Sequence, residues 1–189
     1  MERPLVLTAI IALHAAGVGS AAAAQRLVDV REIPTDTLRD VAVVAYEQGR
    51  PVIYYNPVLM QRVGPQLADF FMAHEYGHIA YGHSGAALTL GGTDVGTVRQ
   101  QQELEADCYA TSALAERNGA AVATALQFFT RLGPFRFDNL HPTGAQRAAK
   151  ILACIPPGVE LPRADAPLAA LPIGWSAPRA PAPTKAIAQ

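Results

Sequence analysis

The chain has 189 residues, half of them apolar, and a net charge of −1 at pH 7. This length fits one domain with short appendages, and the apolar content is enough for a packed core. Because there is no excess of basic residues, we do not expect a nucleic-acid partner.

The first 24 residues have the composition of a secretory signal peptide. Arg3 gives the N-terminal end a positive charge, residues 5–19 are mainly apolar, and residues 22–24 are alanines that suit a cleavage site. An uncleaved anchor helix is the alternative, but the apolar run is short for a membrane span and His14 interrupts it. We therefore expect export to a bacterial periplasm or to the medium, with no stable membrane span after cleavage.

A small sheet is predicted next. Residues 27–33 alternate well enough for a strand, and residues 40–46 and 51–55 are rich in β-branched and aromatic side chains. A connection that contains glycine joins the last two runs, which favours an antiparallel hairpin. Pro51 at the start of the second run is typical of an edge strand.

Most of the remaining chain follows helical patterns. After a short helical turn at Asn56-Pro57, a long helix is expected from Pro65 to Gly82 or Gly85. The Gly-rich residues 84–97 lack periodicity and are expected to form a mobile loop. Three more helices are expected, at residues 98–117, 120–132 and 143–155. The sequence therefore predicts an α+β fold, mainly helical, with a small antiparallel sheet that contains the hairpin at 40–55.

The composition changes after residue 155. Eight of the fifteen prolines fall in the final 34 residues, where they are mixed with alanine. Such a segment cannot bury a core, so residues 156–189 are expected to be a disordered tail or linker. Within this tail, Trp175 is the side chain best suited to dock on another surface. The tail is a candidate contact for an envelope partner. The domain itself is expected at residues 25–155.

The pattern H-E-x-x-H lies in the middle of the long helix. Because residues four apart share one helix face, His74 and His78 can bind the same metal ion, and Glu75 can reach a water on that ion. Two imidazoles and an adjacent carboxylate are the pattern of a zinc metallopeptidase. We predict that both histidines are zinc ligands and that Glu75 is the general base. Gly77 is expected to permit close approach of another helix.

A catalytic zinc site has three protein ligands, so a third ligand must come from a later segment. Glu103 and Asp107 are four apart and share one face of the next helix, whereas Glu105 lies roughly 200° away from Glu103. We predict that Glu103 binds the metal and that Asp107 accepts the N–H of a ligand histidine. A solvated acidic face is the alternative, but this helix is otherwise apolar and rich in alanine.

Three segments in this order resemble the gluzincin zinc peptidases: His74-Glu-Tyr-Gly-His78, Glu103-Leu-Glu-Ala-Asp107 and His141-Pro-Thr-Gly-Ala-Gln-Arg147. They are similar to the family of HtpX, the CAAX prenyl endopeptidase and the BepA-type proteases, which shows H-E-x-G-H, E-x-x-x-D and a later H-P-x-x-x-x-R. The resemblance covers residues 50–155 and implies a zincin-like metallopeptidase domain with the sheet beside the active-site helix. Because the chain lacks the family's transmembrane helices and tetratricopeptide array, we expect a minimal exported form.

The resemblance also implies roles for the third segment. Arg147 is expected to pair with a carboxylate near the site, and Asp107 is the best candidate. His141 is expected at the rim of the cleft, where it bonds the developing oxyanion or occupies the open zinc position. A loop histidine in a His-Pro turn is the alternative for His141.

Two cysteines are present, Cys108 and Cys154, and an even count in an exported protein permits a disulfide. If Arg147 ties the last helix to the helix of Asp107, as the resemblance implies, the two cysteines lie near each other. Two buried thiols that pack as small apolar residues are the alternative.

His83 is not predicted to bind the metal. It lies nine residues after His74, nearly opposite on the helix. The metzincin pattern places a glycine and a third histidine seven and ten residues after the first histidine, where this chain has Tyr81 and Ser84. We expect His83 to interact with the C-terminal end of the helix.

These features predict an exported zinc-dependent endopeptidase with one Zn²⁺ per chain. Its expected substrate is a peptide or an unfolded protein that lies extended along the strand at residues 51–55. Two alternatives remain open: a catalytically inactive zinc-binding module with a chaperone-like or interaction role, and a cytosolic regulatory peptidase of the ImmA/IrrE type. The latter also joins H-E-x-x-H to a later glutamate.

Overall fold

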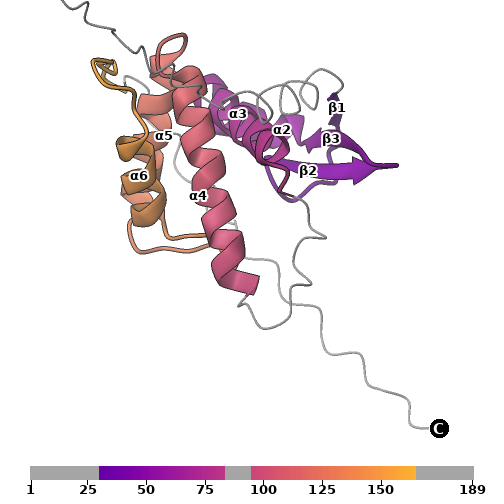
Figure 1. Cartoon of the computed structure of the whole chain (residues 1–189). Coiled ribbons are helices and arrows are strands. Elements are labelled where there is room, and N and C mark those ends of the chain that lie inside the picture. The colour runs from indigo at the N-terminus through magenta and orange to yellow at the C-terminus, as the bar shows by residue number, and fades with distance from the viewer. Residues whose placement is uncertain (1–29, 84–94, 165–189) are drawn as a thin grey trace, which may run out of the picture.

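The structure is a computed structural model that describes residues 30–83 and 95–164 (Figure 1). The expected signal peptide, residues 84–94 of the Gly-rich segment and the tail from residue 165, with Trp175, lie outside the described residues. No helix in the two described stretches has the length and hydropathy that a membrane span needs.

The sheet has three strands, β1 (Arg31–Pro34), β2 (Ala42–Glu47) and β3 (Arg50–Tyr55), in the order β1-β3-β2. β2 and β3 form the predicted antiparallel hairpin, but β1 pairs parallel to β3. The α+β class is therefore confirmed, whereas the sheet is mixed and not antiparallel. The prediction that the strand starting at Pro51 lies at the edge is wrong, since β3 is central and β1 and β2 are the edge strands.

The strand register explains how a proline is accommodated in the central strand. Gln48 and Gly49 both have positive φ and form a two-residue turn, so Glu47 and Arg50 are the first pair of the hairpin and Tyr46 lies opposite Pro51. Along an antiparallel ladder, hydrogen-bonded residue pairs alternate with pairs that form no hydrogen bonds to each other. Because the first pair is hydrogen-bonded, the next pair is not, and the backbone nitrogen of Pro51 points away from β2. On the other side, the pairing with β1 begins only at Val52. The missing N–H of Pro51 therefore breaks no ladder bond.

Five helices follow in the described part of the chain: α2 (Pro57–Val63), α3 (Pro65–Tyr81), α4 (Val95–Leu114), α5 (Gly119–Leu132) and α6 (Gly144–Ala153). Their order and number match the prediction. The main difference is α4, which begins at Val95, inside the segment predicted as a loop, and ends at Leu114 instead of residue 117.

The ends of α3 and α6 follow from local sequence signals. Pro65 occupies the first turn of α3, and Gly82 ends that helix in the left-handed conformation at φ 69°. α6 begins with a capping box, in which Thr143 and Gln146 satisfy each other's backbone N–H groups.

α3 is buried between two apolar clusters. Leu67 and Phe70 pack with α4, α5 and α6, whereas Ile79 packs with Ile53 of the sheet. Figure 1 shows α3 between the sheet on one side and these three helices on the other. Because most of its faces are covered, the polar side chains of the H-E-x-x-H segment are buried as well.

The contact between α3 and α4 depends on a glycine. A Cβ atom added to Gly77 would lie 2.9 Å from the Cα of Ala106 and 3.1 Å from its carbonyl oxygen. Since real Cβ atoms do not approach a backbone so closely, only glycine permits this spacing. The expected close helix approach at Gly77 is confirmed, and it brings the acidic face of α4 to the histidines.

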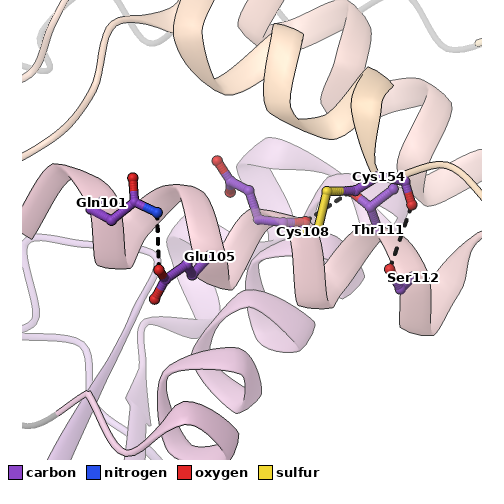
Figure 2. The surroundings of a disulfide bond; sticks show 7 residues. Gln101, Glu105, Cys108, Thr111, Ser112 and Cys154 are labelled. Carbon is purple, nitrogen blue, oxygen red and sulfur yellow. Dashed lines mark hydrogen bonds between the residues drawn. A yellow bond between two sulfur atoms is a disulfide. The ribbon is translucent and has the colours of Figure 1, made fainter.

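A disulfide joins α4 to the end of α6. Cys108 and Cys154 are bonded, with their Cα atoms 5.3 Å apart (Figure 2). The packed chain continues beyond α6, because Val159 and Leu161 contact the core of the helical bundle. These two residues belong to the segment predicted as a tail, so the packed part extends past residue 155.

Candidate metal centre

Three side chains from α3 and α4 converge at one point. His74 Nε2 lies 3.1 Å from His78 Nε2, and the Glu103 carboxylate lies 3.2 Å from His74 Nε2 and 3.3 Å from His78 Nε2. All three residues belong to the group of possible metal ligands that lie within 4.8 Å of one another. The predicted ligand set is thus brought together in space.

The donor atoms fit a zinc ion in type and spacing. Two ligand atoms that are each about 2.1 Å from a tetrahedral zinc ion lie about 3.4 Å apart. The observed separations of 3.1 to 3.3 Å are close to this value. Two imidazole nitrogens and one carboxylate also match the ligands of a catalytic site that keeps one position open.

Asp107 holds His74 in the orientation that this site needs. The Asp107 carboxylate accepts a hydrogen bond from His74 Nδ1 at 2.9 Å, so Nε2 is the nitrogen that faces Glu103 and His78. Asp107 also accepts two bonds from Arg147, whose guanidinium lies 4.1 Å from the ring centre of Phe129. The predicted contacts of Asp107 with His74 and Arg147 are therefore present in the structure.

The electrostatics of the centre favour a positive charge among these ligands. Burial alone disfavours the imidazolium, but hydrogen bonds to Asp107 and Glu103 raise the pKa of His74 to about 10. Burial likewise opposes ionisation of Glu103, yet its bonds to His74 and His78 hold the pKa of that carboxyl well below its usual range. A metal cation supplies such a charge without a proton.

Glu75 connects this centre to the outer edge of β2. It is 8% exposed, and burial raises the pKa of its carboxyl to about 7. Its Oε2 accepts a hydrogen bond of 2.9 Å from the backbone N–H of Val44 in β2. Val44 therefore directs its backbone N–H away from β3, and alternation along the strand gives Ala42 and Tyr46 the same orientation.

A cleft of about 470 Å³ passes over the three ligands and Glu75. β2 forms one wall, and Arg99, Glu103 and His141 line the cleft from other elements. Arg99 lies one helical turn before Glu103, and its Nε is buried without a hydrogen-bond partner among the described residues. The cleft thus combines a free strand edge with acidic and basic side chains.

His141 lies beside the ligands and is held there by a residue that the sequence reasoning did not identify. Asp138 accepts hydrogen bonds from His141 Nδ1 at 2.8 Å and from its backbone N–H at 2.9 Å. His141 Nε2 is 4.0 Å from Glu103, and the side chain is 29% exposed. An aspartate three residues before a histidine, in a turn that ends at Pro142, is the signal that could have indicated this contact.

His83 lies close to the centre although it is not a ligand. Gly82 turns the chain back at the end of α3, and the His83 backbone N–H bonds to the His78 carbonyl at 2.8 Å. The His83 ring then lies against the His78 ring, and its far side contacts Glu105 of α4. Burial lowers the pKa of His83, and the neighbouring His78 lowers it further by a smaller amount. The prediction placed His83 at the helix end but did not identify these side-chain contacts.

A family model described as Peptidase U49 matches residues 63–160, just over half of the chain, and this span contains all three predicted ligands, Glu75 and Arg147. No curated protein and no solved structure matches the chain.

Proposed function

Because the chain belongs to the peptidase U49 family, we propose that it is a zinc-dependent endopeptidase of the gluzincin type. The observation that supports this most directly is the convergence of His74 Nε2, His78 Nε2 and the Glu103 carboxylate beside Glu75. The third ligand comes from a second helix, as the resemblance to the HtpX family implies. A zinc ion held by these three residues would polarise the scissile carbonyl and lower the pKa of a bound water towards ~7.

Glu75 is the general base in this proposal. Its Oε2 is occupied by the Val44 N–H, so Oε1 is the oxygen that takes the proton of the attacking water and later delivers it to the leaving amine. The raised pKa of Glu75, about 7, suits a group that both accepts and donates a proton near neutral pH.

His141 assists on the opposite side of the reacting carbonyl. Asp138 holds Nδ1, so Nε2 points towards the ligands and is the ring atom placed to interact with the developing oxyanion. This interaction is worth most in the transition state, where the negative charge on oxygen is largest.

The free edge of β2 is the substrate-binding strand in this proposal. An extended peptide adds to β2 through the outward backbone groups of Ala42 and Tyr46 and the carbonyl of Val44, since the Val44 N–H is bonded to Glu75. This strand replaces the one at 51–55 that was expected from the sequence. The substrate is therefore a peptide or a locally unfolded protein segment. Arg99 supplies a positive charge in the cleft for a carboxylate of that substrate.

The disulfide supports an oxidising compartment. Disulfides such as Cys108–Cys154 persist in exported proteins and are rare in the cytosol, which favours export over a cytosolic peptidase of the ImmA/IrrE type. N-terminal sequencing of the protein from its native host is expected to begin near residue 25. Recovery of the chain from the cytosol with residues 1–24 intact would contradict export.

The proposed base is tested by Glu75→Gln, which keeps the size of the side chain but removes the acceptor of the proton. We expect about 10²- to 10⁴-fold slower cleavage of an unfolded protein substrate, with the zinc content unchanged. Equal cleavage by Glu75→Gln and wild type would remove Glu75 from the mechanism. Zinc binding without cleavage by the wild type would favour the inactive binding module.

A further inference from the structure

We propose that His83 and Glu105 are positioning residues for the metal ligand His78, as Asp107 is for His74. The inference rests on the proposed zinc site, because it concerns how His78 presents its lone pair to a metal. It is carried by a continuous chain of contacts: His78 Nδ1 to His83 Nδ1 at 3.1 Å, His83 Nε2 to Glu105 at 3.0 Å, and Gln101 to Glu105 at 2.9 Å.

The direction of these hydrogen bonds follows from chemistry. An ionised carboxylate can only accept, so His83 Nε2 donates to Glu105. A neutral imidazole carries one N–H, so His83 Nδ1 is an acceptor and His78 Nδ1 must donate to it. The remaining nitrogen, His78 Nε2, then has its lone pair directed at His74 and Glu103.

The backbone at the end of α3 makes this arrangement possible. A regular helix would carry residue 83 away from His78, but Gly82 adopts φ 69° and reverses the chain. The two imidazole rings are consequently 5.2 Å apart between centroids, and His83 is 9% exposed.

Glu105 completes the contact from the neighbouring helix. It lies on α4 between Glu103 and Asp107 but points in another direction, so it reaches His83 and not the metal ligands. Figure 2 shows Glu105 directed away from the disulfide of Cys108, with Gln101 bonded to its carboxylate one turn earlier. α4 therefore provides a metal ligand and supports both histidines, with Asp107 acting on one and Glu105 on the other.

Zinc affinity of the full chain, measured by competition with a chromophoric chelator, tests this inference without relying on peptidase activity. Partners that orient a ligand histidine are typically worth 10- to 100-fold in metal affinity. We therefore expect His83→Ala and Glu105→Ala to weaken zinc binding by about tenfold or more. Glu105→Gln keeps one acceptor oxygen and is expected to fall between wild type and Glu105→Ala. Substitution of cobalt for zinc should give altered visible spectra in the two alanine variants.

Glu116→Ala is the matched control, because Glu116 is exposed and lies after the end of α4. Glu105 is also partly exposed, at 40% of its side chain, so its replacement should not unfold the protein. Zinc affinity of Glu105→Ala and His83→Ala within twofold of the control would overturn the inference. If the wild type binds no zinc, the zinc-peptidase assignment itself fails, and this inference fails with it.

Discussion

At the scale of single residues, the buried contact of Asp107 with Arg147 and His74 is the most sensitive point of the site. Asp107 is fully buried and is the only described carboxylate that Arg147 bonds directly. Removing one partner of a buried ion pair leaves the other charge without compensation, which costs about 3–5 kcal/mol.

The variant Asp107→Asn tests this point. We expect its free energy of unfolding to fall by about 3–5 kcal/mol, because the Arg147 guanidinium stays buried beside a neutral amide. Chemical denaturation measures the change. The control is Asp69→Asn, at an exposed position of α3 where the carboxylate accepts one bond from Asn118. Equal stability of the two variants would show that the Asp107–Arg147 pair contributes little.

The site residues that helical geometry alone could predict are those that share one face of a single helix, whereas the contact of Arg147 with Asp107 was predicted only from the family resemblance. His74 and His78, and likewise Glu103 and Asp107, share faces because they are four apart, and the helical period alone determines this. Asp138, by contrast, acts through a turn, and His83 acts through the positive φ of Gly82, so helical periodicity predicts neither. Helical periodicity agreed with the structure in leaving His83 out of the ligand group, but it did not predict that the His83 ring lies against His78.

At the scale of elements, the helices were easier to predict than the sheet. Pro65, Gly82 and the capping box at Thr143 are local signals, so the bounds of α3 and α6 follow closely from the sequence. Strand order is a non-local property, and no local pattern in the sequence indicated that β1 would pair parallel to β3. The position of Pro51 was misleading for this reason, because its missing N–H falls where neither neighbouring strand requires it.

The disulfide between α4 and α6 is an element-scale feature with a measurable effect. It closes a loop across a sequence separation of 46 residues. In the chain-entropy estimate, a cross-link over a loop of this size raises the free energy of unfolding by about 4 kcal/mol. We expect the double variant Cys108→Ala and Cys154→Ala to lose about 2–4 kcal/mol of unfolding free energy. Reduction of the wild type under the same denaturant series should give a similar loss. A double variant as stable as the oxidised wild type would show that packing alone holds the two helices together.

At the scale of the whole molecule, the site lies where the two packed parts of the described chain meet. α3 is buried between the sheet and the helical bundle, so it carries the H-E-x-x-H residues into the centre of the fold. The bundle brings Glu103, Asp107 and Arg147 to one side of them, and the sheet brings the free edge of β2 to the other. This arrangement places the proposed metal ligands, the proposed general base and the proposed substrate-binding strand in one cleft.

The central claim is that this cleft cleaves peptides only when a zinc ion occupies it. The most direct measurement is the rate of peptide hydrolysis by the chelator-treated protein as zinc is added back. We predict no hydrolysis in the zinc-free protein and full recovery at one equivalent of zinc per chain. Hydrolysis that persists in the zinc-free protein, or that zinc does not restore, would contradict the claim.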